Sequence, residues 1–87
     1  MNEIAKNVNA LLKPLGLEAS GIYKCKRGLI ITGCLINDPD EPLDDCMFML
    51  EKNGKFREYG FTENPQELTE ATTKRENILY SRKGGAK

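Results

Sequence analysis

The 87-residue sequence contains no histidine. This absence removes the side chain that most often serves as a general base, a metal ligand or a charge switch near neutral pH. The glycines before the last few residues occur singly, so no glycine-rich phosphate-binding loop follows a hydrophobic stretch. No cysteine or serine stands in a pattern that supplies it with a base. We therefore predict that the protein is not an enzyme and has no cofactor.

Long hydrophobic runs are also absent. No apolar stretch approaches the roughly 20 residues that a membrane-spanning helix needs, and the first residues, Met-Asn-Glu-Ile-Ala-Lys, contain no hydrophobic signal core. Hydrophobic residues make up 39% of the chain and charged residues 30%, which is ordinary for a soluble globular domain. We expect a cytoplasmic protein with a single domain over residues 1–80, followed by a disordered basic tail over residues 81–87.

Cysteines are few, at positions 25, 34 and 46. Their number is odd and their spacing matches no metal-binding motif. Free cysteine is among the residue types most often buried in proteins. We predict that all three are reduced, mostly buried thiols, and that there is no metal site.

The chain carries 13 basic and 13 acidic residues, but they are distributed unevenly. Residues 1–36 and residues 52–87 each have an excess of three basic residues, whereas residues 37–51 contain six acidic residues and no basic one. The balanced total excludes a general electrostatic attraction to nucleic acid. A local acidic stretch between two mildly basic regions remains.

The most hydrophobic stretch is residues 29–36, Leu-Ile-Ile-Thr-Gly-Cys-Leu-Ile. Its length, its β-branched residues and the Asn-Asp-Pro that follows it are typical of a β-strand. Its apolar residues do not alternate with polar ones, so both faces of this strand need cover. We predict that the strand lies inside a sheet.

Two helices are predicted, one at each end of the chain. The first is predicted over residues 2–13, from an apolar stripe that begins at Ile4, passes through Val8 and continues to Leu15 beyond the helix end. Gly16 offers a left-handed end. The second helix begins with Asn64 as its N-cap and Pro65 in the first turn, and we expect it to continue to about Tyr80.

Three further strands are predicted, over residues 20–26, 46–51 and 55–61. For the hairpin that ends in residues 29–36, a two-residue turn places Cys25 opposite Ile30, and a three-residue loop places it opposite Leu29. For the second hairpin, the Asn-Gly pair at 53–54 predicts a two-residue turn that pairs Leu50 with Arg57.

These elements predict an α+β fold of order α-β-β-β-β-α. The four strands form an antiparallel sheet, and we expect both helices to pack on one face of it. The other face then needs cover from a second copy of the chain or from a partner protein.

Residues 37–45 contain two prolines and five carboxylates, and we predict an exposed loop without regular structure. The spaced acids resemble a calcium loop, but Leu43 and Met49 occupy the positions that require glycine and glutamate, which disfavours calcium binding. The loop is either a solvated connection or a contact surface for a basic partner. The candidate partner-binding residues are Asp38, Asp40, Glu41, Asp44 and Asp45.

The first functional hypothesis is a small interaction module, an adaptor or inhibitor of a larger complex of the kind that phage and mobile-element genomes encode in proteins of this size. The alternative is a nucleic-acid-binding domain that uses a basic hairpin and the basic end of the second helix. The candidate residues for that alternative are Lys24, Lys26, Arg27, Lys74, Arg75, Arg82 and Lys83.

Overall fold

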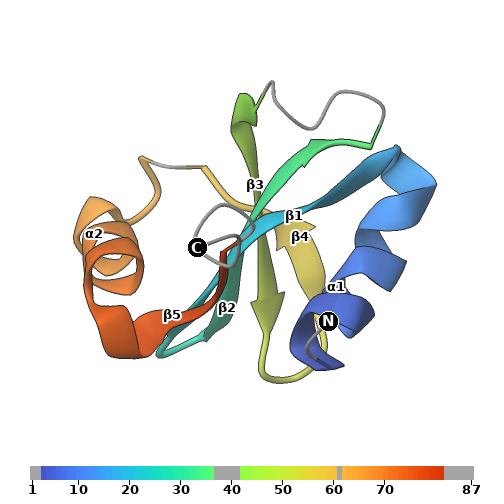
Figure 1. Cartoon of the computed structure of the whole chain (residues 1–87). Helices are drawn as coiled ribbons and strands as arrows, with labels where there is room; N and C mark the ends of the chain where they lie inside the picture. The colour runs from blue at the N-terminus through green and yellow to red at the C-terminus, as the bar shows by residue number, and fades with distance from the viewer. Residues whose placement is uncertain (1–2, 37–41, 61, 82–87) are drawn as a thin grey trace.

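The computed structural model describes residues 3–36, 42–60 and 62–81. The elements in chain order are α1 (Glu3–Leu12), η1 (Lys13–Leu15), β1 (Leu17–Cys25), β2 (Gly28–Leu35), β3 (Pro42–Glu51), β4 (Phe56–Glu58), α2 (Pro65–Thr73), η2 (Arg75–Asn77) and β5 (Ile78–Ser81). Within these residues the strands form one antiparallel sheet in the order β4-β3-β2-β1-β5 (Figure 1). The predicted α+β class is confirmed, but the sheet has five strands rather than four.

Strand β2 lies in the middle of the sheet, as predicted from its sequence. It pairs with β1 on one side and with β3 on the other. Its neighbouring side chains Ile30 and Ile31 belong to two different buried clusters and are both fully shielded from solvent. Because its apolar residues do not alternate with polar ones, β2 contributes to the buried clusters on both faces of the sheet.

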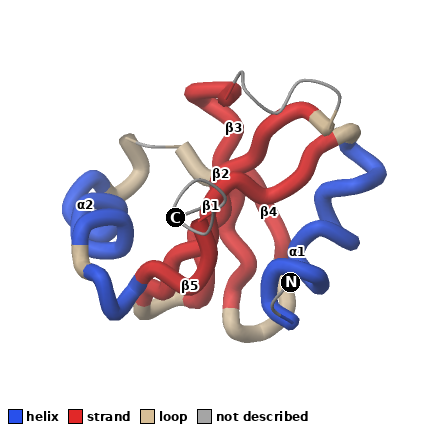
Figure 2. Tube along the Cα trace, viewed as in Figure 1, coloured by secondary structure: helices blue, strands red, loops and turns tan. Residues whose placement is uncertain are grey.

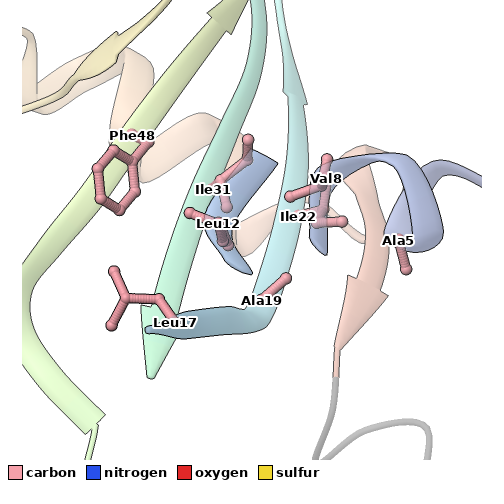
Figure 3. Packing of buried hydrophobic residues seen from close by; sticks show 8 residues of the cluster. All are labelled: Ala5, Val8, Leu12, Leu17, Ala19, Ile22, Ile31 and Phe48. Carbon is pink, nitrogen blue, oxygen red and sulfur yellow. The ribbon is translucent and has the colours of Figure 1, made fainter. Parts of the chain in front are cut away.

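The two helices lie on opposite faces of the sheet, so the prediction that they share one face is wrong (Figure 2). Val8 and Leu12 of α1 pack against Ile31 and Phe48 on one face (Figure 3). Ala71 of α2 packs on the other face, in the cluster that contains Ile30, Met47, Met49 and Tyr59. The physical reason is that β2 and β3 present large apolar side chains to both faces of the sheet. A helix on each face shields these side chains from water, which lowers the free energy of the folded state. The expectation of a sheet face without helical cover is therefore also wrong.

Helix α1 confirms the predicted first helix, which a single 3-10 turn extends to Leu15 before the chain reverses at Gly16. Its apolar stripe is only partly buried. Val8 and Leu12 are shielded, but Ile4, Leu11 and Leu15 are exposed along one flank of the helix. On another side of the helix, Asn9 Oδ1 accepts a hydrogen bond of 2.7 Å from the backbone N–H of Ala19 in β1.

The second predicted helix begins as expected and ends earlier. Asn64 Oδ1 accepts a hydrogen bond from the Glu67 N–H at 3.1 Å, and Pro65 occupies the first turn. The helix stops at Thr73 because Lys74 adopts an extended conformation. Residues 78–80, predicted as the end of this helix, and Ser81, predicted as the start of the tail, instead form β5, which pairs with β1. Burial of Leu79 and Tyr80 against the α1 cluster overrides the helical periodicity.

Both hairpin registers differ from the predictions. In the first hairpin Cys25 pairs with Gly28, which corresponds to neither predicted partner. The turn does contain two residues, but they are Lys26 and Arg27, one position earlier than a turn that would pair Cys25 with Ile30. In the second hairpin Leu50 pairs with Phe56 rather than with Arg57. The Glu51 N–H donates to the Lys55 carbonyl oxygen, so the loop contains three residues and not two. A three-residue loop that ends in a left-handed glycine is an established alternative to the two-residue turn.

The one-residue shift in the second hairpin decides which aromatic residues share a face. Phe56 stacks on Phe48 with ring centroids 5.2 Å apart, on the side of α1. Tyr59 lies on the other side with Met49, where it is buried beneath α2. Because side chains alternate along a strand, a shift of one residue exchanges the two faces.

Candidate functional site

The predicted acidic site is only partly contained in the described residues. Asp38, Asp40 and Glu41 lie outside them. Asp44 and Asp45 lie in β3, which begins at Pro42, so the prediction of an irregular loop is wrong for residues 42–45. Proline is compatible with the first residue of a strand, and Pro42 pairs with Cys34 of β2. Pro42 therefore stands at the start of the strand without preventing it.

Exposed apolar side chains gather at the end of the sheet from which residues 37–41 depart. Leu15, Leu35 and Ile36 are 54%, 38% and 44% exposed. Pairing of Leu17 with Leu35, and a hydrogen bond of 3.1 Å from the Ile36 N–H to the Gly16 carbonyl oxygen, hold these residues at the same end of the first hairpin. We call Leu15, Leu35 and Ile36 the apolar end. No pattern in the sequence distinguishes these residues from core residues, because their exposure depends on the tertiary structure.

The predicted basic residues differ in their surroundings. Arg27 is ion-paired, with its Nη2 atom 2.7 Å from Glu67 Oε1 and 3.0 Å from Glu63 Oε2. Lys24 and Lys26 remain exposed beside the turn of the first hairpin. Lys74 and Arg75 are exposed after the end of α2. Arg82 and Lys83 lie outside the described residues.

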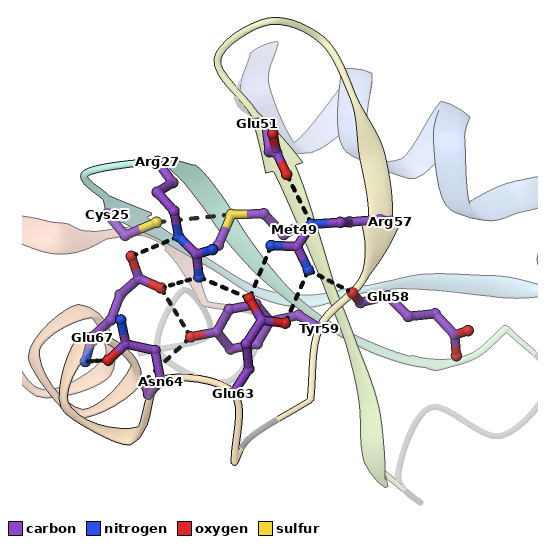
Figure 4. Close-up of polar contacts among 10 residues, drawn as sticks. All are labelled: Cys25, Arg27, Met49, Glu51, Arg57, Glu58, Tyr59, Glu63, Asn64 and Glu67. Carbon is purple, nitrogen blue, oxygen red and sulfur yellow. Dashed lines mark hydrogen bonds and ion pairs between the residues drawn. The ribbon is translucent and has the colours of Figure 1, made fainter.

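Arg27 belongs to a charge network that the sequence did not reveal (Figure 4). Glu63 accepts hydrogen bonds from both guanidinium NH groups of Arg57, at 3.0 and 2.9 Å, and from Arg27 at 3.0 Å. Glu51 binds Arg57 Nε at 2.8 Å, and the Tyr59 hydroxyl donates to Glu67 Oε1 at 3.0 Å. The network joins the first hairpin turn and β4 to α2 and to the residues that lead into it.

The network shifts the pKa values of its members away from neutrality. Hydrogen bonds from Arg57, and then from Arg27, lower the pKa of Glu63 to about 2. Hydrogen bonds from the arginines also lower the pKa values of Glu51 and Glu67. Burial, and then the hydrogen bond to Glu67, raise the pKa of Tyr59 to about 12. These shifts suit a structural connection better than acid–base chemistry, which needs a group that titrates near the working pH.

We predict that Glu63→Gln lowers the melting temperature at pH 7, and that its difference from the wild type shrinks as the solution is acidified. The folded-state pKa of Glu63, about 2, lies below the ordinary value of 4.5. Its ionisation therefore stabilises the fold fully above about pH 4.5, and this contribution is lost as the pH falls towards 2. Thermal unfolding followed by circular dichroism between pH 7 and pH 3 measures the effect.

Glu58→Gln is the matched control, because Glu58 is an exposed carboxylate of β4 that forms no ion pair with another described residue. Its melting temperature should follow that of the wild type at every pH. A constant difference between Glu63→Gln and the wild type across this range would show that the charge of Glu63 does not stabilise the fold.

The three cysteines are free thiols, as predicted, but Cys25 and Cys46 are only half-buried. Cys34 is buried and donates to the Glu18 carbonyl oxygen at 3.6 Å, and the Cys25 thiol lies 3.9 Å from the sulfur of Met49. Burial raises the pKa of Cys46, so this thiol is a weak nucleophile. Among the residues that the structure describes, no group of three acidic or cysteine side chains is arranged to hold a metal ion.

The sequence matches no protein-family model, and searches of the curated proteins and of the solved structures also gave no match. No helix in the described part of the chain is long and apolar enough to cross a membrane.

Proposed function

We propose that the protein is a small cytoplasmic interaction module that binds a partner protein through the apolar end and the acidic residues that follow it. The exposure of Leu15, Leu35 and Ile36 at one end of the sheet is the observation that supports this function. The five carboxylates of residues 37–45 follow Ile36 directly in the sequence. A surface of this kind fits a partner that presents an apolar patch bordered by lysine and arginine.

The two kinds of residue contribute differently to such binding. Exposed leucine and isoleucine side chains supply affinity when a partner shields them from water. Carboxylates at the border of an interface mainly accelerate the encounter and select partners of opposite charge. Both properties suit an adaptor or inhibitor, which acts by occupying a surface of a larger complex and needs no reactive group of its own.

We predict that Leu15→Gln and Ile36→Gln each weaken partner binding by about tenfold while leaving the melting temperature nearly unchanged. The tagged protein is used to capture partners from a lysate of the native host, and mass spectrometry identifies them. The affinity of the purified partner is then measured for each variant by calorimetry.

Ile78→Gln is the matched control, because Ile78 is similarly exposed, at 38%, but lies in β5 near the other end of the first hairpin. This variant should bind like the wild type. Equal affinity of Leu15→Gln, Ile36→Gln and Ile78→Gln for the captured partner would exclude the apolar end as the binding surface.

Neutralising the acidic residues separates this function from nucleic-acid binding. Conversion of Asp38, Asp40, Glu41, Asp44 and Asp45 to their amides should weaken binding of a basic partner protein and reduce its salt dependence. If the protein instead binds nucleic acid through its basic residues, the same change removes five negative charges and should tighten binding. The two functions therefore predict effects of opposite sign in one variant.

A further inference from the structure

A groove lies at the turn of the first hairpin, which β1 and β2 form. The apolar end lies at the other end of this hairpin. The groove lies between the turn of this hairpin and α2, and its volume is about 610 Å³. This volume falls within the range of about 300–1,000 Å³ that is typical of small-molecule sites. The lining residues come from β1, both hairpin loops, α2 with its N-cap, and η2. They include Lys24, Lys26, Lys52, Gln66, Glu70 and Asn77.

The groove is positively charged. Lys24, Lys26 and Lys52 line it, and no carboxylate of the described residues lies within ion-pair distance of their ammonium groups. Glu67 also lines the groove and is ion-paired at 2.7 Å with Arg27, which it shares with Glu63. Glu70 is the other carboxylate, so the three lysines and two carboxylates give the lining a net charge of +1.

The other polar side chains of the groove are carboxamides. Asn64 uses its Oδ1 atom to cap α2, which leaves its NH2 group as a donor. Asn77 donates its NH2 group to the Glu70 carbonyl oxygen, which leaves its Oδ1 atom as an acceptor. Gln66 can supply either group. The lining thus combines cationic groups for an anion with donors and acceptors for a polar ring or hydroxyl.

From this arrangement we propose that the groove binds a nucleotide, with the phosphate at the three lysines and the base or sugar near the carboxamides of α2 and η2. Lysine ammonium groups bind phosphate as point charges, and carboxamides can bond both donor and acceptor edges of a base. The nucleotide is either a free molecule or one unit of a single strand, since the groove recognises the same chemistry in both.

This site is independent of the proposed protein-binding function. The groove is next to the pairing of Cys25 with Gly28, whereas the apolar end is next to the pairing of Leu17 with Leu35. Variants of one site therefore leave the other intact, and either proposal can fail alone.

The test is a titration of ¹⁵N-labelled full-length protein with ADP and, separately, with the single-stranded oligonucleotide dT12, up to 1 mM in low salt. We expect saturable shifts of the amide resonances of Cys25, Gln66 and Asn77. Shifts with ADP identify a free-nucleotide site, and shifts with dT12 alone identify a strand-binding site. The absence of saturable shifts at the groove with both probes overturns the proposal, as do shifts confined to other surfaces.

The variants should change affinity in opposite directions. Lys24→Gln, Lys26→Gln and Lys52→Gln should each weaken binding of the active probe by about fivefold, because each removes one attractive charge. Glu70→Gln should tighten binding by about two- to fivefold, because it removes the repulsive charge. Lys6→Gln on α1 and Glu58→Gln on β4 are exposed controls outside the groove. Effects of the controls as large as those of the groove variants would show a nonspecific attraction and overturn the proposal.

Discussion

Replacing Ile31 by alanine should lower the free energy of unfolding by about 2–5 kcal/mol. Ile31 lies in the central strand, is fully shielded from solvent, and packs in the same cluster as Val8, Leu12 and Phe48. Alanine removes three carbon atoms from this cluster, and the rigid sheet beneath them limits how far the cavity can collapse. Because a small domain has a total stability of roughly 5–15 kcal/mol, this loss is a large share. Urea denaturation followed by circular dichroism measures it.

Ile4→Ala is the matched control for Ile31→Ala. Ile4 is 39% exposed on α1, and alanine has the higher helix propensity, so we expect a change below about 0.5 kcal/mol. If the two substitutions destabilise the protein equally, the central strand does not anchor the core as the structure shows.

Replacing Gly28 by alanine should destabilise the protein by at least about 3 kcal/mol, because two separate costs combine. Gly28 has a φ of 148°, a conformation that side chains disfavour. A Cβ atom at this position would also collide with the Leu50 carbonyl oxygen and lie 2.9 Å from the Cα atom of Glu51. Both are backbone atoms of β3, so relief requires the pairing of β2 with β3 to open. The same urea denaturation experiment measures the loss.

Gly54→Ala separates the two costs. Gly54 also has a positive φ, of 94°, but a Cβ atom there meets no other atom within 4 Å. We expect a loss of about 1–2 kcal/mol from backbone strain alone. Similar losses for Gly28→Ala and Gly54→Ala would mean that β3 does not approach Gly28 closely.

The parts of the fold that the sequence predicted correctly depend on local signals. The apolar stretch that became β2 needs cover on both faces wherever it lies, and the Asn64-Pro65 start of α2 is stabilised by neighbouring residues. The end of α2 was predicted wrongly because residues 78–81 gain more from pairing with β1 than from continuing a helix. Pairing between segments so far apart leaves no local signal.

The candidate sites were harder to predict for the same reason. Arg27 was assigned to a basic surface, but it binds carboxylates 36 and 40 residues later in the chain. The exposure of Leu15 and the inclusion of Lys52 in the groove depend on where helices settle on the sheet. The residue types were visible in the sequence, whereas their spatial grouping required the tertiary structure.

The edge of β1 has a consequence for the order in which the sheet can be completed during synthesis. One edge of β1 pairs with β2. On the opposite edge, the Ala19 N–H donates to the Asn9 side chain, and residues 21–23 pair with β5. The first of these contacts comes from a helix that leaves the ribosome before β1, whereas the second comes from a strand that is translated more than 50 residues later. The nascent chain can therefore protect the edge at Ala19 as soon as β1 forms. The edge at residues 21–23 stays open to unwanted strand pairing until β5 emerges.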